Sequence, residues 1–249
     1  NAYFGRTEYA NDEDFDGSWG IWDEPFLKFS VEKMTLMKQP FHSAIFTLSS
    51  HHPYKIPEKY KGKFAKGHLE IHESIGYADH AIRLFFQEAK KQSWYTNTLF
   101  ILVADHSSIS DHPFYRNTIG QFAIPVLFFR PDNSLKHTYS KVFQQTDILP
   151  STLDLIGYNK PFFSFGKSYS DTLDRYAVYY IDSRHYFLND SLAIDLVNYN
   201  INNVVNYRRD SLLEKGLITF YPFVTEKRYC QAYLQIYNKR LINNACTAK

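Results

Sequence analysis

The sequence predicts an α/β fold with a mostly parallel sheet, flanking helices and a small β-rich subdomain at the C-terminus. Through the first two thirds of the chain, short apolar strand-like runs alternate with helical periodicity and irregular loops. After Gly166 the pattern changes to short strands that follow one another directly. Hydrophobic residues make up 44% of the 249 positions, which is the usual proportion for a chain that buries a core.

The N-terminal elements can be placed in order. The first 30 residues are aromatic and acidic, and we expect a loop leading into a helix that Pro25 helps to start. Residues 40–50 are aromatic and β-branched and end in two serines, which predicts a strand that stops at a turn. Residues 51–64 contain two prolines and should form an irregular surface loop.

The strongest periodic signal lies between residues 68 and 92, where apolar residues recur every three or four positions and predict an amphipathic helix. Residues 98–104 and 122–129 are predicted to be buried strands. Residues 144–158 predict a further helix, which Pro150 bends or starts. Strands and helices in this order favour the parallel sheet.

The C-terminal part reads differently. Residues 175–190 predict a hairpin that turns at Asp182-Ser183, and residues 191–199 could extend it. Residues 225–243 predict a basic amphipathic helix. We favour packing of this helix on the sheet over docking to a membrane or a partner.

Composition excludes several classes of protein. The net charge of +2 is small and evenly spread, so no nucleic-acid partner is expected. Cys230 and Cys246 lack zinc-site spacing, and we expect two free thiols, or one disulfide if the protein is exported. No apolar run approaches the ~18 residues of a membrane helix. The first residues contain no targeting signal and read as a chain entered partway.

Candidate ligands follow two of the predicted strands. Asp105 and His106 come directly after residues 98–104, and the run Ser49-Ser50-His51-His52 ends residues 40–50. Ligands bind at the carboxyl ends of strands in open α/β sheets, so these groups should meet at one edge. A carboxylate and an imidazole are good ligands for Zn²⁺ or Mn²⁺. From these residues alone, a helix cap and a surface histidine explain the Asp-His pair equally well.

The motifs together resemble the sulfatase group of the alkaline phosphatase superfamily, in the branch of the membrane-anchored lipoteichoic acid synthases, which are phosphoglycerol transferases. The resemblance runs from about Tyr3 to Tyr169 and is carried by six segments. These are "YFGRTEY", "DGSWGIWDEPFL", "FTLSSHHPYKIPEKYKGKF", "IGYADHAIRLFF", "WYTNTLFILVADHS" and "QTDILPSTLDLIGY". It implies that residues 1–170 are the C-terminal part of a sulfatase-like catalytic domain and that residues 171–249 form the small β-rich subdomain ending in a helix.

The resemblance also implies roles for particular residues. Asp105 and His106 match the family's ligands for a divalent ion, which is Mn²⁺ or Mg²⁺ in this branch and Zn²⁺ or Ca²⁺ elsewhere. His51 matches the histidine that faces the substrate phosphate, as a catalytic and substrate-binding residue. Phe4 and Arg6 match the aromatic-x-Arg that holds glycerol phosphate. A planar guanidinium suits an anionic oxygen because it can donate two charge-assisted hydrogen bonds.

Two departures from the family pattern are visible. Ser107 stands where the family usually has glycine after Asp-His, so the local geometry should differ. The family's nucleophile and first metal ligands lie upstream of these motifs, and no Cys-x-Pro-x-Arg occurs in the chain. We therefore expect a chain without its nucleophile and inactive by itself.

Other polar or aromatic residues have structural explanations. His52 should pack on its neighbours, and His112 is as well explained by a turn as by ligation. Trp19 and Trp22 should pack the loop against the body, with stacking on a glycerol or lipid head group as the alternative. Solvated helix positions account for Asp79, His80 and Arg83, and a cap or structural role accounts for Asp147.

These observations favour a metal-dependent hydrolase or transferase of phosphodiesters or sulfate esters, most similar to the phosphoglycerol transferases. The alternatives are a sulfatase of aryl or sugar sulfates and a non-catalytic domain that binds a glycan or lipid head group. The resemblance implies a lipid-linked glycerol phosphate or another anionic ester as substrate. It also implies a location on the extracytoplasmic face of the cell membrane, with attachment through an upstream segment.

Overall fold

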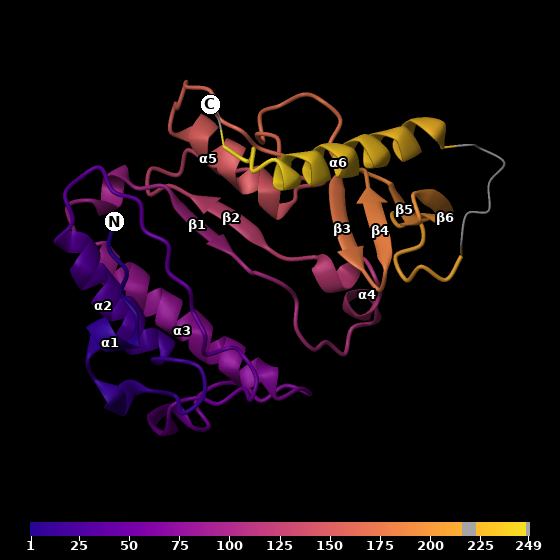
Figure 1. Cartoon of the computed structure of the whole chain (residues 1–249). Helices are drawn as coiled ribbons and strands as arrows, with labels where there is room; N and C mark the ends of the chain where they lie inside the picture. Colours follow the sequence, from indigo (N-terminus) through magenta and orange to yellow (C-terminus); the bar gives the residue numbers. More distant parts are fainter. Residues whose placement is uncertain (216–222, 248–249) are drawn as a thin grey trace. The chain divides into compact units, whose positions relative to one another are not determined.

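The computed structural model describes residues 1–215 and 223–247. Contacts between Cα atoms divide the chain into two compact units, residues 1–137 and 138–249. The first unit contains the helices and strands α1 (Arg6–Tyr9), α2 (Asp23–Thr35), α3 (Ile71–Ala89), β1 (Phe100–Val103), α4 (Pro113–Arg116) and β2 (Val126–Phe129) (Figure 1). Short 3-10 helices lie at Asp12–Asp14, Glu58–Tyr60, Tyr95–Asn97, Gly120–Phe122 and Gln145–Asp147.

The core of the first unit forms where α2 packs along α3 (Figure 1). Pro25 lies in the first turn of α2, where its missing N–H costs no hydrogen bond, and Asp23 and Glu24 complement the helix dipole there. The predicted helix at 68–92 is confirmed as α3. The buried core residues of this unit are Val31, Met34, Ala89, Trp94 and Tyr95, against which Phe85, Phe86, Phe100 and Phe129 pack.

The α/β class is confirmed, but the predicted parallel pairing is wrong for the strands described. β1 and β2 pair in antiparallel register, with Phe100 opposite Phe129 and Val103 opposite Val126. A parallel pair needs a crossover that carries the chain back to the start of the first strand, usually through a helix. The connection between β1 and β2 contains only the four-residue α4 and one 3-10 turn, and it returns the chain alongside β1.

The strand predicted at 40–50 does not form a ladder. Residues 41–48 form no strand. Phe41 and Ile45 still pack on the core of the unit, which accounts for the apolar pattern in the sequence. Apolar alternation identifies an extended, half-buried segment, but a strand also needs a partner for its backbone.

The second unit contains α5 (Ile148–Leu155), a sheet of four strands in the order β3-β4-β5-β6, and α6 (Val224–Ile242). The strands are β3 (Ala177–Ile181), β4 (Arg184–Leu188), β5 (Leu192–Val197) and β6 (Asn200–Asn206), and each neighbouring pair is antiparallel. The predicted hairpin and its extension are confirmed. Asp182 and Ser183 both have positive φ, as a two-residue turn requires. β6 was not predicted; it follows a second such turn at Asn198-Tyr199.

One face of α6 packs on this sheet, as predicted. Cys230 and Leu234 lie in a buried cluster with Phe187, Ile194, Leu196 and Val204 from the strands. Both cysteines are free, with Cys230 buried and Cys246 exposed. Burial raises the pKa of the Cys230 thiol to about 11, so this side chain is a core residue and not a nucleophile. The sheet β3–β6, with α6 packed on it, is the β-rich C-terminal subdomain that the sequence predicted.

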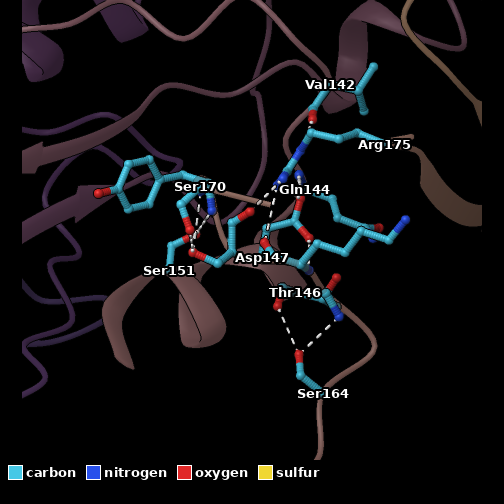
Figure 2. Close-up of polar contacts among 12 residues, drawn as sticks. Val142, Gln144, Thr146, Asp147, Ser151, Ser164, Ser170 and Arg175 are labelled. Atoms are coloured by element: carbon cyan, nitrogen blue, oxygen red, sulfur yellow. Dashed lines mark hydrogen bonds and ion pairs between the residues drawn. The ribbon is translucent and has the colours of Figure 1, made fainter. Parts of the chain in front are cut away.

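A buried ion pair joins α5 to the segment before β3 (Figure 2). Arg175 Nη2 donates to Asp147 Oδ2 over 3.0 Å, and the two side chains are 1% and 4% exposed. The same guanidinium donates to the carbonyl oxygens of Val142, Lys167 and Ser168. Asp147 also accepts from the backbone amides of Gln144 and Lys167. Asp147 is thus structural, as expected from the sequence.

The predicted division after residue 170 follows the extent of the sequence resemblance and stays a prediction. In the structure, α5 belongs with the second unit, because the contacts divide the chain between residues 137 and 138. Pro150 lies in the first turn of α5 and starts this helix instead of bending it.

Candidate active site

The N-terminal segment holds Arg6 in a defined position. α1 is stabilised by a capping arrangement in which Gly5 N donates to Glu8 Oε2 over 2.7 Å. Arg6 Nε donates to Asp12 Oδ1 over 2.7 Å, and the guanidinium carbon lies 3.8 Å from the centre of the Phe15 ring. The hydrogen bond to Arg6 lowers the pKa of the Asp12 carboxyl. Because Asp12 uses Nε, the two terminal nitrogens of Arg6 remain to donate to an anion.

Phe4 lies beside α2. Its ring meets the Phe29 ring edge to face, with 6.1 Å between centroids, and the Lys33 ammonium lies 5.7 Å from the Phe4 ring. The sequence-based role of Phe4 in holding glycerol phosphate stays a prediction. Its contacts in the structure are with residues of α2.

A tight turn presents Trp19. Asp16 Oδ1 accepts hydrogen bonds from the amides of Ser18 and Trp19, each over 2.7 Å, and from that of Gly20 over 3.2 Å. A Cβ at Gly20 would lie 2.8 Å from Leu48 Cδ1, so glycine permits this close approach. Trp19 is left 52% exposed, and its indole Nε1 donates to the carbonyl oxygen of His52 over 2.6 Å.

His51 lies against this tryptophan. The two ring centroids are 4.0 Å apart with 51° between the planes. His51 Nδ1 lies 2.9 Å from the carbonyl oxygen of His52. A carbonyl oxygen only accepts hydrogen bonds, so Nδ1 carries the hydrogen and Nε2 is the nitrogen that can accept, ligate or, after protonation, donate. His51 also lines a hollow formed with Asp16, Trp19, Trp22 and Lys55.

Asp105 and His106 are exposed after β1, with side chains 58% and 61% exposed. His106 Nδ1 lies 2.7 Å from the carbonyl oxygen of Ser107, which leaves Nε2 as the nitrogen that could bind a metal ion. Nε2 lies 3.5 Å from Asp105 Oδ2. Two ligand atoms that bind one ion at about 2.1 Å are separated by about 3.0–3.5 Å, so this pair fits two positions of a Zn²⁺ or Mn²⁺ shell. Within residues 1–215 and 223–247, no group of three His, Cys, Asp or Glu side chains could hold a metal ion.

A hydrogen bond brings the two loops together. Tyr54 Oη and Ser108 Oγ are 3.1 Å apart. Tyr54 lies three residues after His51, and Ser108 lies two residues after His106. The loop that carries His51 therefore contacts the loop that carries the Asp-His pair. The predicted meeting of two strand ends at one edge of a sheet is not what joins them, because the segment before His51 forms no strand. The Ser107 hydroxyl, where the family has glycine, donates to the carbonyl oxygen of Gln121.

The remaining candidates have structural partners. His112 Nδ1 accepts from the amide of Phe114 and so caps α4. The ring of His52 meets that of Tyr54 at 5.5 Å. His80 is half-buried and bonds Tyr60, so its predicted solvation is wrong, whereas Asp79 and Arg83 form an exposed pair. Trp22 packs on Tyr77.

Sequence reasoning missed two residues beside His51. Asp23 is 3% exposed and bonds the backbone that leads to His51, and Tyr54 bridges to Ser108. The signal for Asp23 is its position in the first turn of a helix, which a cap explains equally well. Tyr54 lies within the SSHHPY motif, but nothing local to the sequence indicates its partner.

Residues 1–158 match the family model described as Sulfatase. The chain belongs to the sulfatase family. This sulfatase chain is 26% identical over 199 residues to lipoteichoic acid synthase 1 of Bacillus subtilis (strain 168), covering 70% of the chain and 30% of that protein. It is 22% identical over 252 residues to lipoteichoic acid synthase of Staphylococcus saprophyticus, covering 92% of the chain and 33% of that protein. The chain thus spans about a third of the length of these curated relatives.

Solved structures share the fold of this sulfatase chain. A protein in the alkaline phosphatase superfamily from Vibrio parahaemolyticus matches with a TM-score of 0.81 and 26% identity, over 98% of the chain and 60% of that structure. Lipoteichoic acid synthase LtaP from Listeria monocytogenes matches with a TM-score of 0.76 and 16% identity, over 98% and 64%. The alkaline phosphatase type of fold and the resemblance found in the motifs are confirmed.

Proposed function

We propose that this chain belongs to a metal-dependent transferase or hydrolase that acts on phosphodiesters, with phosphoglycerol transfer from a lipid as the reaction. One observation carries the proposal: the Tyr54–Ser108 hydrogen bond joins the loop of His51 to the loop of Asp105 and His106. A phosphate-facing imidazole and a pair of metal ligands on adjoining loops are the components of a phosphoryl-transfer site. The names of the relatives, lipoteichoic acid synthases, support the same class of substrate.

In this proposal Arg6 binds the phosphate of the substrate. Its Nε is already bonded to Asp12 and its face lies over Phe15, so the guanidinium is oriented before the ligand arrives. The terminal nitrogens then donate to two anionic oxygens as charge builds on them. Pre-orientation lowers the entropy that binding would otherwise cost.

His51 faces the leaving oxygen through Nε2. With Nδ1–H directed at the His52 carbonyl, a protonated His51 can donate only from Nε2. A donor held in this way can stabilise or protonate the oxygen that leaves phosphorus. The tilted Trp19 ring, with its centroid 4.0 Å from that of the imidazole, restricts rotation of His51 about its side-chain torsions.

Asp105 and His106 would hold a divalent ion, Mn²⁺ or Mg²⁺, with Zn²⁺ or Ca²⁺ as further candidates. When bound, such an ion polarises a phosphoryl oxygen and lowers the pKa of a coordinated hydroxyl. The 3.5 Å separation of Oδ2 and Nε2 and the carbonyl contact at His106 Nδ1 support two ligand positions. Further ligands and the hydroxyl nucleophile are assigned to none of these residues, and inactivity of the chain alone stays a prediction.

The proposed substrate is a lipid-linked glycerol phosphate, and the proposed location is the extracytoplasmic face of the cell membrane. Both rest on likeness to the lipoteichoic acid synthases. Among the helices that the structure describes, none is long and apolar enough to span a bilayer.

A binding experiment tests the ion site. The chain, titrated with Mn²⁺ and followed by electron paramagnetic resonance, should bind the ion at a site that Asp105→Asn weakens by about tenfold or more. Asp79→Asn is the matched control, because Asp79 precedes His80 in a second Asp-His pair, on α3. Equal loss in both variants, or none in either, would refute the ion site.

A second experiment tests the anion site. Arg6→Ala should weaken the binding of glycerol phosphate by about tenfold, the loss expected for one charge-assisted hydrogen-bonding group. Arg83→Ala removes a guanidinium that is also exposed and paired with an aspartate, and it should leave binding unchanged. Isothermal titration calorimetry measures both.

The non-catalytic alternative has one observation in its favour, since Ser107 stands where the family usually has glycine and its hydroxyl bonds the carbonyl oxygen of Gln121. A head-group binding domain would take up glycerol phosphate with the same affinity whether or not Mn²⁺ is present. A transferase site should bind the phosphate more tightly with Mn²⁺, because the ion and Arg6 neutralise the same group.

A further inference from the structure

A buried carboxylate holds the backbone that leads to His51. Asp23, the first residue of α2, is 3% exposed. Its Oδ1 accepts from the amide of Leu48 over 2.8 Å and from that of Ser49 over 3.1 Å. Two amides that converge on a single oxygen fix the direction of the chain at residues 48–49.

The contact is reciprocal. The amide of Asp23 donates to Ser49 Oγ over 2.9 Å, and Ser49 is 4% exposed. An amide in the first turn of a helix has no partner within the helix, so Ser49 satisfies it from a distant segment. The start of α2 and the end of the 41–49 segment are therefore joined in both directions.

The backbone at Leu48, which Asp23 holds, is hydrogen-bonded directly to His51. The amide of His51 donates to the carbonyl oxygen of Leu48 over 3.0 Å, which closes a turn on the residue that Asp23 holds. Trp19 then fixes the far side of the turn, through its ring on the imidazole and its indole N–H on the His52 carbonyl. The His51 ring is thus set between a clamped backbone and an aromatic face.

We propose that Asp23 is a positioning residue for His51: it holds the turn so that Nδ1 stays on the His52 carbonyl and Nε2 is presented to the phosphate. This rests on the proposed function only in the role that it gives Nε2. Asp23 itself is buried and bonds backbone, so it contacts no substrate.

Two substitutions of Asp23 can separate the effect of its hydrogen bonds from the effect of its charge. Since both amides use Oδ1, Asp23→Asn can accept both of them through its amide oxygen. Asp23→Ala leaves two backbone donors without partners in a buried region, so the turn must shift to find water or another acceptor. Position, not charge, is what the carboxylate contributes to His51.

The test uses the whole chain labelled with ¹⁵N, with histidine side-chain spectra recorded in the absence and presence of glycerol phosphate. In the natural sequence, His51 should show the Nδ1–H tautomer. Asp23→Ala should give mixed tautomers at His51 and bind glycerol phosphate about tenfold more weakly, whereas Asp23→Asn should keep the tautomer and the affinity.

Asp147→Ala is the matched control for general destabilisation. Asp147 is also 3% exposed and accepts from two backbone amides, those of Gln144 and Lys167, in the second unit. It should lower stability without changing the His51 spectrum. If Asp23→Ala does not fold, Ser49→Ala removes one bond of the reciprocal pair and should move His51 in the same direction by less.

Several results would overturn the inference. They are an unchanged tautomer in Asp23→Ala, equal loss in Asp23→Asn and Asp23→Ala, or the same change at His51 in Asp147→Ala. The tautomer is read without any ligand, so it decides the role of Asp23 by itself. If His51→Ala binds glycerol phosphate as well as the natural chain, the proposed function of His51 fails separately.

Discussion

The carbonyl oxygen of His52 receives two donors, the indole N–H of Trp19 and the Nδ1–H of His51. An amide oxygen has two lone pairs, so both bonds can form together. Because Nδ1 is held in this way, Nε2 is the nitrogen of His51 that can take part in chemistry. The backbone carbonyl of His52, and not a carboxylate side chain, determines which nitrogen of His51 faces a substrate.

The same arrangement recurs at His106, where Nδ1 faces the carbonyl oxygen of the next residue. A histidine whose Nδ1 is held by a carbonyl presents Nε2 in a fixed direction, as metal ligands commonly do. His112 is the opposite case. Its Nδ1 accepts from an amide and so carries no hydrogen, which suits a helix cap.

Asp23 should make stability depend on pH. Burial raises the pKa of its carboxyl above the ordinary value of 3.8, in spite of its hydrogen bonds. The folded chain therefore holds this proton more tightly than the unfolded chain does. The contribution of Asp23 to stability is present below pH 3.8 and declines as pH rises through the raised pKa.

Asp23→Asn removes this dependence, because the amide does not titrate. Relative to the natural chain, the variant should gain free energy of unfolding between pH 4 and neutral pH, the range above the ordinary value of 3.8. Urea unfolding at a series of pH values measures the difference. A difference that stays constant, or one that shrinks as pH rises, contradicts the raised pKa.

At the scale of elements, apolar periodicity predicted where α3 lies but not which of its side chains are buried. The helix forms where the apolar spacing indicated, but the positions with no exposed surface are Ser74, Tyr77, Ala81 and Ala89. Ile75, which belongs to the apolar pattern, is 49% exposed. Tyr77 turns inward because its ring packs on Trp22 and its hydroxyl accepts from the amide of Glu24.

In the second unit, the buried Asp147–Arg175 ion pair joins segments that are distant along the chain. Here one guanidinium joins α5 to the carbonyl oxygens of Val142, Lys167 and Ser168, so several connections depend on a single side chain (Figure 2). Buried pairs are costly to break because the partner left behind stays buried and charged.

Arg175→Met should therefore lower the free energy of unfolding by about 3–5 kcal/mol, since Asp147 keeps its charge and three carbonyls lose a donor. Guanidinium unfolding followed by circular dichroism measures it. The exposed pair of Arg83 and Asp79 supplies the control, and Arg83→Met should change stability by less than about 0.5 kcal/mol. Equal effects of the two substitutions would show that burial of the Arg175 pair has no energetic importance.

At the scale of the whole molecule, the two compact units have separate cores. The buried cluster around Val31 and Trp94 lies in residues 1–137, and the cluster around Leu196 and Cys230 lies in residues 138–249. The two clusters share no residue. All three tryptophans, at positions 19, 22 and 94, belong to the first unit.

Leu196→Ala should destabilise the second unit by about 2–5 kcal/mol, because Leu196 is completely buried. If each core supports its own unit, the tryptophan fluorescence transition should keep its midpoint, while hydrogen exchange in β4 and β5 becomes faster. Val31→Ala, in the first core, should have the reverse effect. A common shift of both signals would show that the units unfold as one.

The sequence determined what depends on neighbours along the chain. Helical spacing placed α3, two turn-forming residues placed the β3–β4 hairpin, and the apolar run before Asp105 placed β1. Backbone hydrogen bonds of helices and tight turns close over a few residues, so local residue types are sufficient to predict them.

Only the tertiary structure decided the pairing and the environment of these elements. It made β1 and β2 antiparallel, left residues 41–48 without a ladder, and placed Tyr54 on Ser108 and Asp23 on Leu48 and Ser49. Each of these contacts joins residues more than 20 positions apart. Such contacts depend on which surfaces meet after the chain collapses, and the same residue types would allow many other pairings. The residues of the candidate site can therefore be named from the sequence, while the positioning of His51 follows from the folded chain.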